Sequence, residues 1–226
     1  MKLIQIQTVP VGEIQANCYV LSLPERDDAL VIDPGAEEPA IRLALGKRRI
    51  AAILLTHGHY DHIGAVAALR AGGVPVYIGA EDAQALTNPV YSLAAMFGGA
   101  PSQGEAEYTL SDGDEMTLAG IRLRVLHTPG HTKGGCCFLT DEGQLFSGDT
   151  LFRYGYGRTD LPGGDEKQLF ASVRRLFELD PAIRVYPGHG APTTIAEDRY
   201  TPEDYSRYQR ARVLRGYERG AARVLS

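Results

Sequence analysis

Short apolar runs alternate with polar turns along most of the chain, and they are of two kinds. Runs rich in β-branched residues and bounded by glycine, proline or aspartate predict strands. Runs with apolar residues three and four positions apart predict helices. The expected strands are residues 2–8, 18–23, 29–32, 51–55, 76–78, 115–118, 121–126, 136–139, 144–146 and 183–186. The expected helices are residues 38–45, 63–71, 81–86, 167–179 and 202–217.

Strands and helices interleave in two strand-rich halves, which predicts an α/β or α+β fold. In such a fold two sheets pack on each other and helices cover the outer faces. The 26 glycines and 13 prolines are spread between the elements and do not form one linker. Together with the length of 226 residues, this spread predicts a single domain over residues 1–226.

The C-terminal segment, residues 199–226, differs in charge from the rest of the chain. It holds seven arginines and three acidic residues, a local charge of +4 within a chain of net charge −5, so the other residues carry −9. The first interpretation is a helical tail in which Tyr205, Tyr208 and Tyr217 pack and the arginines face water. The alternative is that these arginines help to hold an anionic substrate.

Composition excludes several classes of protein. With 44% hydrophobic and 23% charged residues the chain is typical of globular proteins, and no apolar run is long enough to span a membrane. The acidic balance argues against a nucleic-acid partner. The three cysteines are odd in number, and Cys136 and Cys137 are adjacent, which disfavours a disulfide framework. We therefore expect a cytoplasmic protein without membrane or nucleic-acid partners, whose cysteines serve as small apolar residues.

The most informative stretch is Thr56–His62, which follows an apolar strand and contains three of the six histidines. His57 and His59 are two positions apart on an extended turn, so both can point to one side. Asp61 and His62, at the start of the next helix, can turn toward an adjacent point. One short segment can thus serve two metal ions. The alternative, a polar surface turn with incidental histidines, is disfavoured by this dense spacing.

The same arrangement recurs three times downstream, each time where an apolar strand gives way to a glycine-rich turn. Ligand sites gather at such strand ends, on loops held by a rigid sheet. A glycine beside each ligand lets the backbone turn sharply and leaves room for ions. The three turns are 126–132 with His127 and His131, 146–150 with Asp149, and 186–190 with His189.

This pattern resembles the metallo-β-lactamase fold superfamily over residues 1–195. The shared features are the T-H-x-H-x-D-H signature and, in order, a later His, a later Asp and a final His. The resemblance implies a four-layer αββα sandwich with metals at one edge of the two sheets. It also implies a first ion bound by His57, His59 and His131, a second bound by Asp61, His62 and His189, and Asp149 bridging both.

The implied ligands are nitrogen and oxygen donors without thiolates, which admits zinc, iron or manganese and does not select among them. We expect two divalent metal ions, with zinc as the first choice and iron or manganese as alternatives. A structural site would instead be closed, four-coordinate and usually rich in cysteine. Metal ions lower the pKa of bound water to about 7, so a bridging hydroxide can attack a carbonyl while one ion stabilises the oxyanion. Asp61 would orient that hydroxide, which makes Asp61 and Asp149 the expected catalytic residues.

Within the superfamily the chain is most similar to glyoxalase II, the hydroxyacylglutathione hydrolases, in their short bacterial form. In that family a basic residue after the bridging aspartate contacts glutathione, and Arg158 occupies this position. Arginine can grip a carboxylate through two parallel hydrogen bonds. The alternative role of Arg158 is a salt bridge with Asp160 or Asp165. The similar segments are residues 17–19, 32–35, 56–64, 127–132 and 147–165.

The expected activity is hydrolysis of an acyl thioester of glutathione or another small thiol. Longer glyoxalase II enzymes have a C-terminal helical domain and a tyrosine where Asp160 stands here, so the thiol carrier stays open. Substrate recognition would then fall to Arg158, nearby loops, the arginine-rich tail or a second subunit of a homo-oligomer. The run 157–160 is shared with persulfide dioxygenases of the same superfamily, which use one iron ion and oxidise glutathione persulfide with oxygen.

Other classes are weaker alternatives. A β-lactamase of this fold usually has cysteine in place of Asp149, and nucleases of the fold generally carry added nucleic-acid-binding segments. A non-catalytic metal-binding protein of the same fold would have lost ligands, whereas every expected ligand is present. His127 lies outside the implied ligand set and is expected to make a supporting hydrogen bond or to pack.

Overall fold

The computed structural model describes residues 3–99 and 102–199, and its strands form two sheets of six strands each. The expected helix 202–217 lies outside the described residues, as does the arginine-rich tail apart from Arg199. Among the described residues, no helix has the length and apolar character needed to cross a bilayer.

The first sheet begins with antiparallel strands and continues with parallel ones. β1 to β3 are antiparallel neighbours, and β3 to β6 run parallel. β2 and β3 are buried along their whole length, which explains why their sequences are mostly apolar instead of alternating. In spatial order the strands are β1 (Gln5–Val11), β2 (Ala16–Ser22), β3 (Asp28–Ile32), β4 (Arg49–Leu55), β5 (Val76–Gly79) and β6 (Tyr108–Leu110).

The second sheet has one parallel pair, β10 and β11, joined by the long helix α5 (Glu166–Leu176). The carboxylate of Asp165 caps this helix by accepting the backbone N–H of Gln168 at 3.0 Å. The other neighbouring strands are antiparallel. In chain order, which is also the spatial order, the strands are β7 (Glu115–Leu118), β8 (Ile121–His127), β9 (Cys136–Thr140), β10 (Gln144–Gly148), β11 (Arg184–Pro187) and β12 (Thr193–Thr194).

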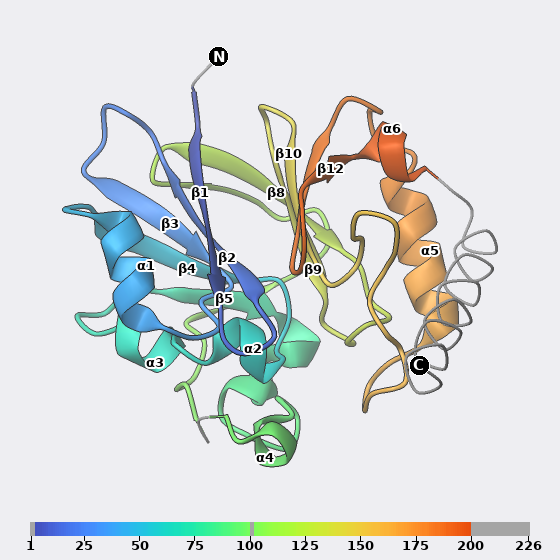
Figure 1. The fold of residues 1–226 in the computed structure, drawn as a ribbon, viewed down its shortest axis with the longest axis horizontal. Coiled ribbons are helices and arrows are strands. Elements are labelled where there is room, and N and C mark those ends of the chain that lie inside the picture. The colour runs from blue at the N-terminus through green and yellow to red at the C-terminus, as the bar shows by residue number, and fades with distance from the viewer. Residues whose placement is uncertain (1–2, 100–101, 200–226) are drawn as a thin grey trace, which may run out of the picture.

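Three buried apolar clusters show four layers (Figure 1). The first cluster joins α1 (Glu38–Leu45) and α3 (Val66–Leu69) to the outer face of the first sheet. The second lies between the sheets, where Phe138 and Phe146 meet Leu21 and Ile32. The third joins α5 to the outer face of the second sheet. The α/β class and the αββα layering are therefore confirmed.

Most expected elements are present with ends shifted by a few residues. The helix expected over 63–71 is instead two short helices, α2 (Tyr60–Ile63) and α3, and the segment expected at 81–86 forms the 3-10 helix η1 (Ala80–Leu86). Four elements of two to four residues were not expected, because so short a run shows no periodicity. They are β6, β12, α4 (Ala94–Phe97) and α6 (Ile195–Asp198).

Candidate metal centre

The polar turns singled out in the sequence meet at one edge of the sandwich. β3 and β4 run parallel in the first sheet, and β8, β10 and β11 share one direction in the second. Their carboxyl ends therefore reach the same edge, as strand ends do in other layered α/β proteins. Asp33 follows β3, His57 and His59 follow β4, His131 lies after β8, Asp149 after β10 and His189 after β11.

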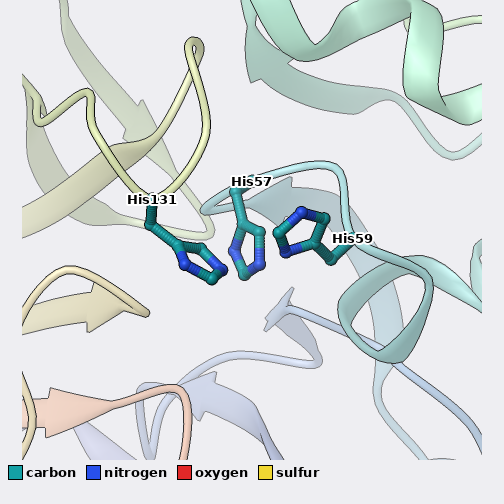
Figure 2. Close-up of side chains that lie close together, drawn as sticks. All are labelled: His57, His59 and His131. Atoms are coloured by element: carbon teal, nitrogen blue, oxygen red, sulfur yellow. The ribbon is translucent and has the colours of Figure 1, made fainter. Parts of the chain in front are cut away.

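The first group of side chains at this edge is His57, His59 and His131. One ring nitrogen of each lies within 4.8 Å of those of the other two, and the ring centroids are 4.6 to 4.9 Å apart. Figure 2 shows the three rings gathered from two loops. Each Nε2 is buried without a hydrogen-bond partner among the described residues. Buried polar atoms are rarely left unpaired, so three of them together fit a bound cation.

The second group is Asp61, His62 and His189, whose ligand atoms also lie within 4.8 Å of one another. The Oδ2 atom of Asp61 is 3.3 Å from the Nε2 atom of His62 and 3.3 Å from that of His189. A carboxylate with two imidazoles is a donor set that divalent zinc, iron or manganese accepts.

Asp149 lies between the two groups. Its Oδ1 is 3.4 Å from Nε2 of His62, and its Oδ2 is 3.5 Å from Nε2 of His131 and 3.7 Å from that of His189. Its Oδ1 is also buried without a hydrogen-bond partner among the described residues. The structure thus brings together all seven side chains that the sequence singled out as ligands, and the clusters can hold a divalent metal.

Hydrogen bonds at Nδ1, the ring nitrogen that faces away from the metal centre, orient three of the imidazoles. Nδ1 of His57 is 3.1 Å from Oγ1 of Thr56, and Nδ1 of His131 is 2.7 Å from the carbonyl oxygen of Arg158. Nδ1 of His62 is 2.9 Å from Oδ2 of Asp33. Such contacts fix the ring orientation and leave Nε2 for a metal.

Asp33 is a site residue to which the sequence analysis gave no role. Its carboxylate accepts the backbone N–H of Thr56 at 2.8 Å and the Thr56 hydroxyl at 2.6 Å, in addition to its contact with His62. One of its oxygens also lies within 4.8 Å of a ring nitrogen of His57 and of one of His62. Because its oxygens are already engaged, Asp33 orients ligands. The signal for it was an acidic residue directly after the buried strand β3 and before Pro34.

The electrostatics differ between the two groups of histidines. Burial, together with the neighbouring histidines, lowers the pKa of His57 and lowers that of His59 to about 3, so both are neutral and able to bind metal. Burial also acts to lower the pKa of His62, but Asp61 and Asp149 outweigh it and raise the pKa. Burial acts to raise the pKa of Asp61, and His62 and His189 outweigh it and lower the pKa. The carboxylates around His62 thus favour positive charge at this point, as a cation site requires.

The turn that carries His189 is tied to the other sheet. The backbone N–H of Asn17 donates to the carbonyl of Gly188 at 2.7 Å, and the Asn17 side chain donates to the carbonyl of Pro187 at 3.0 Å. The Tyr19 hydroxyl donates to the same carbonyl at 2.6 Å. These bonds explain why residues 17–19 belong with the metal-site motifs, since they fix His189 against β2.

A cavity of about 670 Å³ opens over the metal centre, and Arg158 is on its wall. The Arg158 guanidinium makes a two-point salt bridge with Asp160, at 2.6 and 2.7 Å. Of the two salt bridges expected as alternatives, with Asp160 or Asp165, the one with Asp160 is therefore present. Its backbone carbonyl oxygen, which any residue would offer, accepts a hydrogen bond from His131.

His127 is outside both ligand groups, and its Nε2 lies 2.9 Å from the carbonyl oxygen of Lys133. Cys18, Cys136 and Cys137 are all buried and free.

Comparisons with known proteins agree with this arrangement. The sequence model described as the Metallo-beta-lactamase superfamily matches residues 11–189. The Haemophilus influenzae protein named hydroxyacylglutathione hydrolase GloC is 34% identical over 201 residues, covering 86% of this chain and 94% of the relative.

Solved structures give the same result. The structure titled BLEG-1 B3 metallo-beta-lactamase has a TM-score of 0.82 at 36% identity, covering 88% of this chain and 98% of that one. TTHA1623, solved in a di-iron-bound form, has a TM-score of 0.75 at 42% identity, covering 87% and 98%. ETHE1 from Myxococcus xanthus has a TM-score of 0.72 at 29% identity, covering 88% and 83%. The chain therefore belongs to the metallo-beta-lactamase superfamily.

Proposed function

We propose that the protein is a metal-dependent hydrolase that cleaves an acyl thioester of glutathione or a similar small thiol. The observation that carries this proposal is Asp149, whose two oxygens reach histidines of both ligand groups. A carboxylate so placed suits a centre of two ions that share one nucleophile. The similarity to a protein named hydroxyacylglutathione hydrolase supports the thioester as substrate.

In this proposal His57, His59 and His131 hold the first ion, Asp61, His62 and His189 hold the second, and Asp149 contacts both. Zinc is the expected metal, and the di-iron form of TTHA1623 makes iron the first alternative. When bound, two such ions supply a water of lowered pKa and polarise the substrate carbonyl.

The protein's own residues prepare the site for that chemistry. Asp61, at 3.3 Å from two imidazoles, is placed to hold the nucleophile's proton at a carboxylate oxygen. Ile14 and Phe152 line the cavity and offer apolar surface to a substrate. Asp33 keeps His62 aimed at the centre.

Arg158 is the proposed contact for a carboxylate of the thiol carrier. Its salt bridge with Asp160 is solvent-exposed, since the two side chains are 60% and 68% accessible. Exposed ion pairs of this kind contribute only about 0–1 kcal/mol. A substrate carboxylate can therefore replace Asp160 on the guanidinium at little cost.

A second candidate is the oxygen-dependent oxidation of a thiol persulfide at one iron ion. It is favoured by the run 157–160, shared with the persulfide dioxygenases, and by the structural similarity to ETHE1 from Myxococcus xanthus. The same ligand side chains serve both reactions, so the ligands do not separate them.

One paired assay separates the candidates. Purified protein is given S-lactoylglutathione or glutathione persulfide while thiol release, oxygen uptake and metal content are measured. The proposal predicts thiol release from S-lactoylglutathione without oxygen uptake. Oxygen uptake with the persulfide and one iron per chain would favour the dioxygenase, and no turnover of either substrate by the metal-loaded protein would contradict both.

A further inference from the structure

Asp82 is a buried carboxylate near the start of η1 and lies outside the ligand groups described above. Asp82 is only 7% exposed to solvent. Its Oδ2 accepts the backbone N–H of Gly58 at 3.0 Å, and its Oδ1 accepts the backbone N–H of Gly134 at 2.7 Å. One carboxylate thus joins two loops that are far apart in the sequence.

Those two loops carry the three histidines of the first group. Gly58 lies between His57 and His59, and Gly134 lies in the turn that follows His131. The distance between the loops sets the distance between their imidazoles, which must be right within a few tenths of an ångström for a metal to bind tightly.

Close packing around Asp82 fixes the distance between η1 and the two histidine loops. A Cβ atom at Gly58 would lie 2.5 Å from the Cβ of Ala85, and one at Gly134 would lie 2.4 Å from the backbone nitrogen of Asp82. The backbone of η1 therefore rests directly against both loops, at positions where only glycine fits.

His59 depends on this connection more than the other two histidines do. His57 is aimed by Thr56 and His131 by the carbonyl of Arg158. Within residues 3–99 and 102–199, no hydrogen bond to the His59 ring is found. The position of its imidazole therefore follows from the backbone at Gly58, which Asp82 holds, and from edge-on packing against the rings of His57 and His131.

We infer that Asp82 is a positioning residue that fixes the spacing of the two histidine loops and thereby sets the affinity for the first metal ion. The inference rests on the ligand set of the proposed function. Asparagine has nearly the same size but only one acceptor oxygen, so Asp82→Asn loses one of the two links and leaves a buried N–H unpaired.

The test is a Co²⁺ titration of the metal-free protein, followed by visible absorption in the presence of a competing chelator. For Asp82→Asn we expect affinity for the first ion to fall by about 10- to 100-fold, the usual effect of losing a residue that supports a ligand. Affinity for the second ion should change much less.

Asp112→Asn is the matched control: Asp112 accepts the backbone N–H of His127 at 2.8 Å, near the same loop, but is exposed and bridges no pair of ligand loops. The Asp112→Asn variant should bind the first and the second Co²⁺ ion with the same affinities as the unsubstituted protein.

Unchanged affinities in Asp82→Asn, or an equal loss at both sites with a lower melting temperature, would overturn the inference, because a merely structural role would not select one ion. If Asp82→Asn does not fold, Asp82→Glu is titrated in the same way. It keeps both acceptor oxygens but pushes the loops apart, so the same selective loss is expected. The readout is metal binding, so a protein that binds Co²⁺ as described but hydrolyses no thioester would contradict the proposed function alone.

Discussion

Replacing Gly188 by alanine tests the geometry of the metal centre with a single methyl group. The backbone of Gly188 does not have the positive φ that disfavours other residues, so alanine can adopt it. The added Cβ would nevertheless lie 2.1 Å from Oδ1 of Asp149, 2.8 Å from Cε1 of His62 and 3.0 Å from the backbone of Gly148. The effect of Gly188→Ala therefore arises from a collision with two proposed ligands.

The size of the effect follows from these distances. To reach a carbon contact of about 3.5 Å, Asp149 or its neighbours must move by about 1.4 Å. Metal–ligand distances tolerate only about 0.2 Å. We therefore expect bound metal to fall to one ion or fewer per chain and thioester hydrolysis to fall by at least about 100-fold. Overpacking should also cost about 1–3 kcal/mol of unfolding free energy.

The assay combines metal analysis, thiol release and thermal unfolding of the metal-free protein. Gly190→Ala is the control in the same loop: Gly190 has a φ of 80°, so alanine is strained there, but nothing lies within 4 Å of its added Cβ. It should lose stability and keep both ions. Gly188→Ala protein with full metal content and full activity would refute the reasoning.

Three further predictions follow from individual side chains. Asp149→Ala should abolish hydrolysis and lower metal content to one ion or none; full activity with two ions, by metal analysis and kinetics, would rule out a bridging role. Arg158→Ala should raise KM for S-lactoylglutathione with little change in kcat, because the backbone carbonyl that holds His131 remains; unchanged KM would remove Arg158 from the substrate site. In the metal-free protein the pKa of His59 is lowered to about 3, so its contribution to stability is complete above the unfolded pKa of about 6.5 and is lost as pH falls toward 3. Chelated protein should therefore melt at lower temperature at pH 5 than at pH 7, and His59→Gln should reduce that difference.

The sequence predicted the long elements well because each has enough residues to show its period. Helix α1 was expected at the residues where it occurs, and α5 began within one residue of its expected start, beside the capping Asp165. The continuous helix expected over 63–71 was wrong. Its apolar residues do face the core, but the chain breaks at Gly64 and Ala65, after α2 has placed Asp61 and His62.

The proposed ligands were found from the sequence because they are reactive residue types placed directly after strands. The residues that support them were harder to find. Asp33 and Asp82 each lie more than 20 residues from the backbone or ring that they hold, so only the folded chain brings them together. The hydrogen bond between His131 and the backbone carbonyl of Arg158 could not be predicted from the sequence, since every residue has a carbonyl. The salt bridge of Arg158 with Asp160 was foreseen as an alternative, because two residues apart is a local distance.

The measurement that tests the central claim most directly is hydrolysis of S-lactoylglutathione during titration of the metal-free protein with Zn²⁺. The proposal predicts no thiol release without metal and a rate that rises until two equivalents are bound, without oxygen uptake. Thiol release by the metal-free protein, full activity at one equivalent, or none with both ions bound would contradict it.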